Sequence, residues 1–223
     1  MAGQVRVNGH VAAKASETVG ETDSIEVPET ERYVSRGGYK LEHALRHFDL
    51  CTQGVVALDV GASTGGFTDC LLQHGAALVY AIDVGHGQLA WKLRQDPRVV
   101  VMERTNARNL SRGSFPENFS GAGMAVADCS FISLTKILPP LIDLLSASAK
   151  IVALVKPQFE AGKAEADRGA GVIRDPLIHQ RVLRELELFV CGDPRLQWSG
   201  SVESPLLGPA GNKEFLALIE KHS

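Results

Sequence analysis

VVALDVGASTGGFTDC, residues 55–70, is the stretch of sequence that decides the fold. A short apolar run ends at Asp59, a loop of small residues runs from Gly61 to Gly66, and a helical pattern begins at Phe67. A strand, a glycine-rich turn and a helix in this order let backbone N–H groups and a helix N-terminus approach a nucleotide-like ligand. Glycine is needed where a Cβ would block that approach or where φ is positive.

Asp83 supplies the second part of this signal. It closes the next apolar run, LVYAID, where an acidic side chain is placed to accept the ribose hydroxyls of a bound nucleoside. The loop does not match G-x-G-x-x-G, because Ala62, Ser63 and Thr64 separate Gly61 from the next glycine. The spacing therefore favours an adenosine ligand without a pyrophosphate, such as S-adenosylmethionine, over a dinucleotide. A loop without a ligand in an ordinary α/β domain is the alternative.

The composition is that of a globular protein of one domain with a small appendage. The chain has 223 residues, of which 44% are hydrophobic and 22% charged. Four cysteines and seven histidines are scattered, so the sequence predicts a reduced, cytoplasmic setting and no metal site. We find no uninterrupted apolar run of the roughly 18 residues that a membrane span needs, and expect no membrane partner. The net charge of −3 means that any RNA contact comes from a local patch.

The N-terminal segment differs from the rest of the chain. QVRVNG, from residue 4, alternates apolar and polar residues and turns at Asn8-Gly9, a strong hairpin signal, and SIEVP at 24–28 is a second extended piece. This β unit is too small for a core of its own. A helix over about 37–49 follows, with Leu41, Ala44, Leu45 and Phe48 at core spacing.

From residue 55 on, apolar runs alternate with helical patterns. Alternation of this kind predicts a doubly wound α/β fold with a mostly parallel sheet. Strands are expected at 55–60, 78–83, 98–102, 123–128 and 150–156, and helices at 66–75, 87–95, 135–147 and 176–191. RLQWSGSVE and KEFLALIEK near the end have no helix between them, which predicts an antiparallel last strand. Residues 160–175 are expected to form a mobile loop.

Seven short segments in a fixed order carry a family resemblance. They are VRVNG, SRGGYKLEHAL, LDVGASTGGFTDCLL, DVGHGQLAWKLRQDPRVVVMERTNAR, ADCSFISL, LVKPQFE and SPLLGPAGNKEF. Together they resemble the TlyA (haemolysin-like) group of FtsJ-type ribose 2′-O-methyltransferases. The resemblance implies a Rossmann-like fold, S-adenosylmethionine as the methyl donor, and ribosomal RNA, within assembled ribosomal subunits, as the acceptor through its cytidines.

Members of the group also carry an N-terminal alpha-L RNA-binding module, which begins with two helices before a hairpin like QVRVNG. Here Met1 stands just before the hairpin. We therefore expect a partial alpha-L module at 1–30, a linker and leading helix at 31–53, and an FtsJ-like methyltransferase domain at 54–223.

The resemblance also implies a catalytic tetrad of Lys40, Asp128, Lys156 and Glu214. Asp128 and Lys156 close neighbouring predicted strands, at the edge where ligands bind in open α/β sheets. Lys156 is the candidate to deprotonate or polarise a 2′-hydroxyl, provided that burial and Lys40 favour its neutral form. Asp128 would orient it, Glu214 would pair with a lysine, and Lys40 would contact the target nucleotide. Taken singly, each of these residues is an ordinary surface charge or cap.

The donor and RNA contacts are expected from other residues of the same segments. Asp59 would bind the methionine amino group, Asp83 the ribose, and Asn106 the adenine edge. The donor-site prediction comprises Asp59, Gly61, Ser63, Gly65, Gly66, Asp83, Asn106 and Asp128, and the RNA-site prediction comprises Arg32, Arg36, Lys40 and His43. A solvated helix face explains the last stripe equally well. We interpret Phe67, Trp91 and Phe131 as core residues rather than ligand-stacking residues.

Three other functions compete with an RNA methyltransferase. A membrane-active haemolysin would need a membrane span or a cationic amphipathic helix, and neither is evident. A nicotinamide-dependent oxidoreductase would need the G-x-G-x-x-G spacing. A catalytically silent RNA-binding or ribosome-assembly protein would not need the tetrad, and the sequence leaves it open.

Overall fold

A computed structural model describes residues 5–12, 14, 18–26 and 31–222. The chain forms two compact units, Met1–Arg32 and Tyr33–Ser223. In the smaller unit, β1 (Arg6–Val7) pairs antiparallel with β2 (His10–Val11) and β3 (Ile25–Glu26). Asn8 and Gly9 have φ values of 51° and 79°, as the turn of a tight hairpin requires, so the predicted hairpin is confirmed. Residues 27 and 28 of the second extended piece lie outside the described residues.

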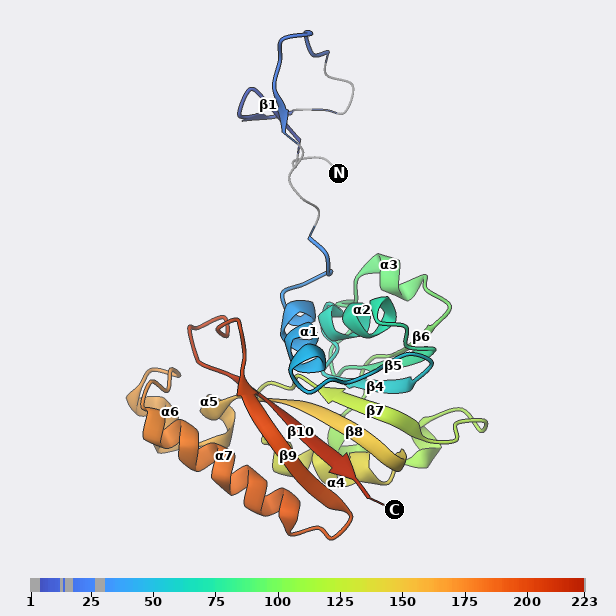
Figure 1. Ribbon diagram of the computed structural model, residues 1–223, viewed down its shortest axis with the longest axis vertical. Coiled ribbons are helices and arrows are strands. Elements are labelled where there is room, and N and C mark those ends of the chain that lie inside the picture. The colour runs from blue at the N-terminus through green and yellow to red at the C-terminus, as the bar shows by residue number, and fades with distance from the viewer. Residues whose placement is uncertain (1–4, 13, 15–17, 27–30, 223) are drawn as a thin grey trace. The chain divides into compact units, whose positions relative to one another are not determined.

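A seven-stranded sheet organises the larger unit, in the order β6–β5–β4–β7–β8–β10–β9 (Figure 1). Its strands are β4 (Val56–Val60), β5 (Leu78–Ile82), β6 (Val99–Met102), β7 (Ala122–Ala127), β8 (Leu145–Val155), β9 (Leu196–Glu203) and β10 (Phe215–Lys221). The first five are parallel, and β10 runs antiparallel to both of its neighbours. The predicted α/β fold with an antiparallel last strand is confirmed.

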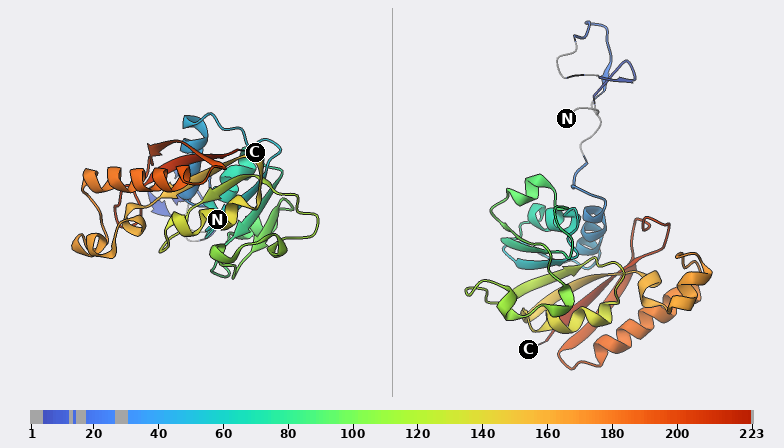
Figure 2. Two further views of the ribbon diagram at one scale, coloured as in Figure 1. Left: turned by 90° about the horizontal axis from the view of Figure 1, so that it is seen from below. Right: turned by 180° about the vertical axis from the view of Figure 1, so that it is seen from behind.

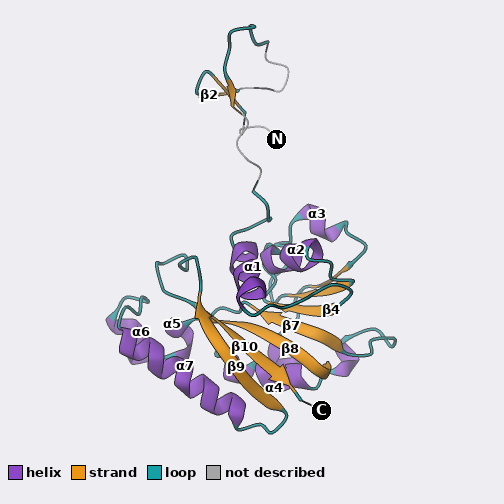
Figure 3. Cartoon of the chain, viewed as in Figure 1, coloured by secondary structure: helices purple, strands orange, loops and turns teal. Residues whose placement is uncertain are grey.

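Helices cover both faces of this sheet (Figures 2 and 3). On one face lie α1 (Gly37–His47), α2 (Gly66–Gln73) and α3 (Trp91–Arg94); on the other lie α4 (Leu138–Ile142) and α7 (Pro176–Cys191). Leu41 and Phe67 pack with Met124 in one core, and Leu138 and Val182 pack with Ile151 in the other. Alternate strand residues therefore face opposite cores, the arrangement of a doubly wound sheet.

Three predicted segments differ in the structure. The helix expected to reach residue 147 ends at Ile142, and β8 already begins at Leu145. Ser146 Oγ donates to Ala122 O at 3.1 Å, so pairing with β7 extends the strand backwards. The helix expected at 87–95 is limited to α3, because Gly87 has a φ of +72° and Ala90 a ψ of 140°, neither of which is helical.

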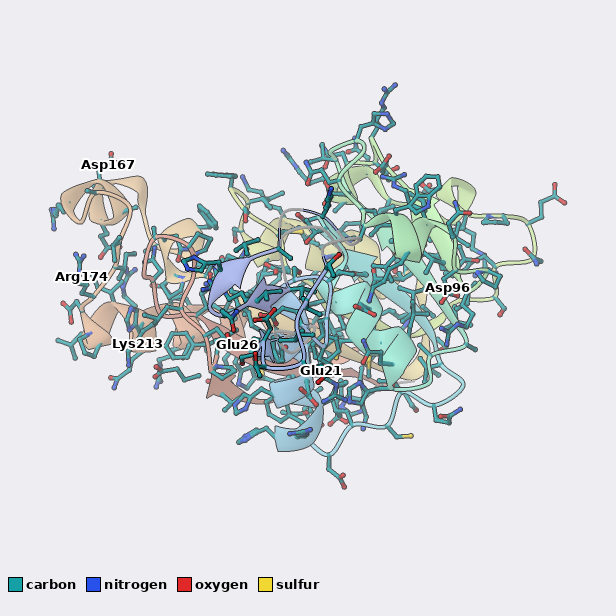
Figure 4. All side chains as sticks on the ribbon, turned by 90° about the horizontal axis from the view of Figure 1, so that it is seen from above. Glu21, Glu26, Asp96, Asp167, Arg174 and Lys213 are labelled. Atoms are coloured by element: carbon teal, nitrogen blue, oxygen red, sulfur yellow. The ribbon has the colours of Figure 1, made fainter. Side chains whose placement is uncertain are left out.

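The predicted loop at 160–175 contains α6 (Lys163–Arg168), and α5 (Pro157–Glu160) precedes it. Both short helices follow the carboxyl end of β8. Asp167 of α6 and Asp96, which follows α3, lie far apart in Figure 4, at opposite ends of the larger unit.

Candidate active site

Two adjoining cavities open at the carboxyl ends of β4, β5, β7 and β8. The lysine cavity, of about 290 Å³, is lined by Lys40, Asp128, Lys156 and Glu214 among others. The Asp83 cavity, of about 470 Å³, is lined by residues that follow β5 and β6. The two cavities share Gly61, Ser63, Asp128 and Ser130 as lining residues. A group held in one therefore lies next to a group held in the other.

Two ion pairs face the lysine cavity. Lys156 Nζ lies 2.6 Å from Asp128 Oδ1 and donates to Ser130 Oγ at 2.9 Å. Lys40 Nζ donates to Glu214 Oε2 at 2.5 Å. Lys40 and Lys156 are each 8% exposed and Glu214 is 1% exposed, so the Lys40–Glu214 pair is shielded from water, whereas Asp128 is half-buried. The four residues that the family resemblance singled out are thus brought together.

Strand register explains how residues so far apart in the sequence meet. Phe215 on β10 pairs with Val155 on β8, so that Glu214 and Lys156 are the next residues beyond this pair. Lys40 enters from α1, which packs against α2 on the same side. A Cβ on Gly208 would lie 2.5 Å from Glu214 Oε1, so the β9–β10 loop closes tightly over this carboxylate. Glu214 Oε1 is buried and has no hydrogen-bond partner among the described residues.

Asp83 organises the other cavity. Its Oδ2 accepts from Ser63 N at 2.8 Å and its Oδ1 accepts from Gly85 N at 2.6 Å. Each carboxylate oxygen has a second lone pair, so the same group can also accept hydroxyl donors from a ligand. Asn106 lines the cavity at the start of a 3₁₀ turn, where its Oδ1 accepts from Arg108 N at 3.0 Å. The amide nitrogen of Asn106 takes no part in that contact.

The glycines of the loop allow neighbouring segments of the protein to pack closely. Gly61 has a φ of +84°, and a Cβ there would lie 2.6 Å from the backbone oxygen of Asp128. A Cβ on Gly66 would lie 2.3 Å from Ser35 Oγ and 2.9 Å from Gly38 N, so this glycine permits α1 and α2 to touch. On Gly65 it would meet Leu89 and Leu93. The absence of a side chain at these three positions thus lets the segments that form the cavity walls pack closely.

Asp59 lies beneath the loop rather than in either cavity. It is fully buried, its Oδ2 accepts from Thr68 Oγ1 at 2.6 Å, and its Oδ1 has no hydrogen-bond partner among the described residues. Burial raises the pKa of Asp59 to about 7, and the charges of Asp128 and Asp83 add to the effect. Among the described residues, those that line the two cavities do not include Asp59, Gly65, Arg32 or His43.

The predicted RNA stripe separates into different environments. Arg36 is exposed and lines the lysine cavity, whereas Lys40 is buried in its pair with Glu214. His43 is half-buried and stacks against His47, with ring centroids 6.2 Å apart. Arg32 is exposed and belongs to the smaller unit. The stripe is therefore not one continuous basic surface.

The aromatic predictions are confirmed for one residue and wrong for two. Phe67 is 3% exposed and packs in the core, as expected. Trp91 is 74% exposed and Phe131 is 90% exposed, so neither is a core residue. Phe131 lies in the segment after β7, with a φ of +64°, and lines the Asp83 cavity. Its ring centroid is 4.9 Å from that of Phe159, which belongs to α5, the short helix that follows β8.

Sequence reasoning missed three residues of this region, Ser130, Phe159 and Glu160. The signal available was their position within ADCSFISL and LVKPQFE, the two segments that also carry Asp128 and Lys156.

Within the described part of the chain, no group of three or more histidine, cysteine, aspartate or glutamate side chains has the arrangement of a metal site. In those same residues, we find no helix with the length and apolar character needed to cross a bilayer.

Comparison with known proteins decides the family. The family model described as FtsJ-like methyltransferase matches residues 33–221. The chain belongs to this family. Within it, the chain is 48% identical over 219 residues to the 16S/23S rRNA (cytidine-2′-O)-methyltransferase TlyA of Mycobacterium tuberculosis, covering 96% of this chain and 79% of the relative. The predicted membership of the TlyA group is thereby confirmed.

Relatives with a haemolysin name belong to the same group. Hemolysin A of Brachyspira hyodysenteriae is 42% identical, with 97% of this chain and 89% of that protein covered. A solved structure from Streptococcus thermophilus, described as a proposed hemolysin, superposes on this chain with a TM-score of 0.82 at 46% sequence identity. The superposition covers 100% of this chain and 80% of that one. FtsJ-like methyltransferases and proteins named as haemolysins thus share this fold and much of this sequence.

Proposed function

We propose that this enzyme transfers a methyl group from S-adenosylmethionine to the ribose 2′-hydroxyl of cytidines in ribosomal RNA. The observation that carries the proposal is the convergence of the Lys40–Glu214 and Lys156–Asp128 pairs on one cavity. That cavity adjoins a second one with the polar groups that a nucleoside needs. We infer the acceptor, cytidines of ribosomal RNA, from the names of the mycobacterial and other relatives. The proposed setting is assembled ribosomal subunits in the cytoplasm.

The Asp83 cavity fits the adenosyl part of the donor. Asp83 would accept from the ribose hydroxyls while keeping its two backbone contacts, and Asn106 would donate to the adenine edge. Gly61, Ser63 and Asp128 line both cavities, so these residues would hold the methionine end of the donor beside Lys156. When bound, S-adenosylmethionine supplies a methyl group already activated by its positive sulfur. No metal is needed for this chemistry.

Lys156 handles the hydroxyl that receives the methyl group. Asp128 and Ser130 hold its Nζ at 2.6 and 2.9 Å, which fixes the amine at the junction of the two cavities. As the C–O bond forms and the methyl–sulfur bond breaks, the hydroxyl proton would pass to Lys156 in its neutral amine form, after the ammonium group paired with Asp128 has released a proton to solvent. Lys40, fixed by Glu214, presents a second cation for the target ribose or its phosphate.

RNA approaches from the open side of the lysine cavity. Arg36 is exposed at its wall and supplies a phosphate contact, which positions RNA without reading its sequence. The exposed ring of Phe131, next to Phe159, offers a stacking face for an unstacked base. The predicted contacts by Arg32 and His43 stay predictions, since those residues lie outside the lysine cavity.

The decisive experiment follows labelled methyl transfer from S-adenosylmethionine to unmodified ribosomal subunits. Nuclease digestion then locates the label, which we expect on ribose 2′-oxygens of cytidines. We expect Lys156→Ala to abolish transfer and to leave donor affinity near normal. Lys150→Ala is the matched control, because Lys150 lies on the same strand β8 but outside both cavities. Donor binding without any label on RNA would instead indicate a silent RNA-binding protein or a different acceptor.

A further inference from the structure

Glu160 ties together the two chain segments that carry the reacting side chains. It is the last residue of α5, the short turn that follows Lys156. Its Oε2 accepts from Ser133 Oγ at 2.6 Å and its Oε1 accepts from Leu134 N at 2.8 Å. Both partners belong to the segment that follows Asp128. One half-buried carboxylate therefore bridges the ends of β7 and β8 with both of its oxygens.

Two pairs of side chains connect the same two segments as the Glu160 bridge. Each pair has one residue on the segment after β7 and one on the segment after β8. In the first pair, Lys156 meets Asp128. In the second pair, Phe159 meets Phe131, with ring centroids 4.9 Å apart. A shift of one segment against the other would thus change the position of the lysine amine and of the exposed ring at the same time.

Phe131 needs such support more than its neighbours do. Its φ of +64° is in the left-handed region, which a non-glycine residue occupies only when its surroundings hold it there. Its ring is 90% exposed, so burial in the core does not fix it. The two hydrogen bonds of Glu160 anchor the chain two and three residues further on. Ser133 also starts the 3₁₀ turn Leu134–Lys136, where Thr135 N donates to its Oγ at 3.2 Å.

We propose that Glu160 is a positioning residue, which holds the 128–134 segment in the conformation that presents Phe131 and Asp128 to the acceptor. This inference rests on the proposed function, because it concerns the acceptor side of the same site. Glu160 is not among the residues that line either cavity in the described structure, so its effect runs through Ser133 and Leu134. In the described structure, the hydrogen bonds of Asp83, Asn106 and the glycine loop do not involve Glu160, whereas Asp128, Ser130 and Phe131 of the held segment line the Asp83 cavity as well.

The test compares Glu160→Ala, Glu160→Gln and Ser133→Ala. We expect Glu160→Ala to lower kcat by about tenfold to a hundredfold, since a misplacement of about 1 Å costs that much. Donor affinity by calorimetry should fall by less than kcat, because Asp128, Ser130 and Phe131 also line the Asp83 cavity, and Tm should stay close to the wild-type value. Glutamine accepts from Leu134 N and donates to Ser133 Oγ, so Glu160→Gln should recover kcat to within about threefold of wild type. Glu165→Ala is the control, because Glu165 pairs with Arg181 away from the cavities.

A double-mutant cycle and hydrogen exchange complete the design. Combining Ser133→Ala with Glu160→Ala should lower kcat no further than Glu160→Ala alone, as residues of one contact are not additive. Amide exchange in a peptide covering 129–136 should be faster in Glu160→Ala than in Glu165→Ala. Unchanged exchange and kcat would overturn the proposal. So would a loss of activity that follows equal losses of Tm and donor affinity, which would show a merely structural role.

Failure of the proposed function would look different. In that case the wild-type enzyme would put no label on ribose, whereas exchange of the 129–136 peptide would still respond to Glu160→Ala. The exchange measurement therefore tests whether Glu160 holds the 128–134 segment in place, and it does not require an active enzyme.

Discussion

The close approach of β4 and β7 at Gly61 leads to a quantitative prediction for Gly61→Ala. A methyl group at this position would lie 2.6 Å from the backbone oxygen of Asp128 and 2.9 Å from its carbonyl carbon. Neither atom moves easily, because Asp128 N donates to Val60 O at 2.9 Å and Gly61 N donates to Ile82 O at 2.8 Å. The φ of +84° adds a second penalty, since alanine avoids the left-handed region.

The expected magnitude is the sum of these two terms. The left-handed backbone costs alanine about 1–2 kcal/mol. Forcing a methyl group into a packed site costs about 1–3 kcal/mol. Gly61→Ala should therefore lower the free energy of unfolding by about 2–5 kcal/mol, a large part of the roughly 5–15 kcal/mol of a typical domain.

Gly54→Ala is the matched control for this substitution. Gly54 has a φ of +72°, close to that of Gly61, but a Cβ there meets no atom within 4 Å. It should cost only the backbone term of about 1–2 kcal/mol. Urea denaturation of both variants, followed by circular dichroism, measures the difference. Equal losses in the two variants would refute the reasoning, because they would show that β4 and β7 separate at no cost. Donor affinity should also fall in Gly61→Ala alone, since Gly61 lines both cavities.

Three further perturbations test other parts of the site. Asp83→Ala should weaken S-adenosylmethionine binding by at least about tenfold, or about 1.4 kcal/mol; calorimetry checks this, and unchanged affinity would remove Asp83 from the donor site. Asp59 has a pKa raised by burial from 3.8 to about 7, so the stability that its neutral form contributes is present in full below about pH 4 and is lost as the pH rises through 7. Asp59→Asn should flatten that part of the stability curve measured by urea denaturation, and an unaltered curve would mean that another group causes the loss. Phe67→Ala should lower the free energy of unfolding by about 3–5 kcal/mol because its ring is buried, while Trp91→Ala should change it by no more than about 0.5 kcal/mol because its side chain is 74% exposed. Thermal unfolding compares the two variants, and a large loss of stability in Trp91→Ala would contradict the exposed position of this side chain.

The relation between Lys156 and Glu214 shows how far strand patterns reach. Local periodicity placed Lys156 at the end of one strand and Glu214 near the start of the last one, and the absence of a helix between the last two extended runs indicated an antiparallel strand. These features depend on residues close together in the sequence, so the hydrophobic pattern of one sequence is enough to predict them. The Asn8-Gly9 turn and the 55–70 loop are of the same kind, because positive φ values and glycine are linked by local sterics.

Ser146, Trp91 and Phe131 mark where such reasoning stops. Ser146 joins β8 because Ala122 O lies beside it, a contact between residues that the sequence does not place together. An aromatic residue is buried only if another element covers it, and neither Trp91 nor Phe131 is covered in the larger unit. The sequence predicts Gly66 as a ligand contact, whereas the structure shows it at the point where α1 meets α2.

The sequence by itself determined the order of strands and helices, the loop that follows β4, and the chemical groups available for catalysis. Only the tertiary structure decided which groups meet. Lys40, separated from Glu214 by 174 positions, lies 2.5 Å from it, and Glu160 reaches back to Ser133 across 27 positions. The physical reason is that periodicity and turn chemistry act between near neighbours, whereas these contacts depend on how sheet register and helix packing bring distant segments to one edge of the sheet.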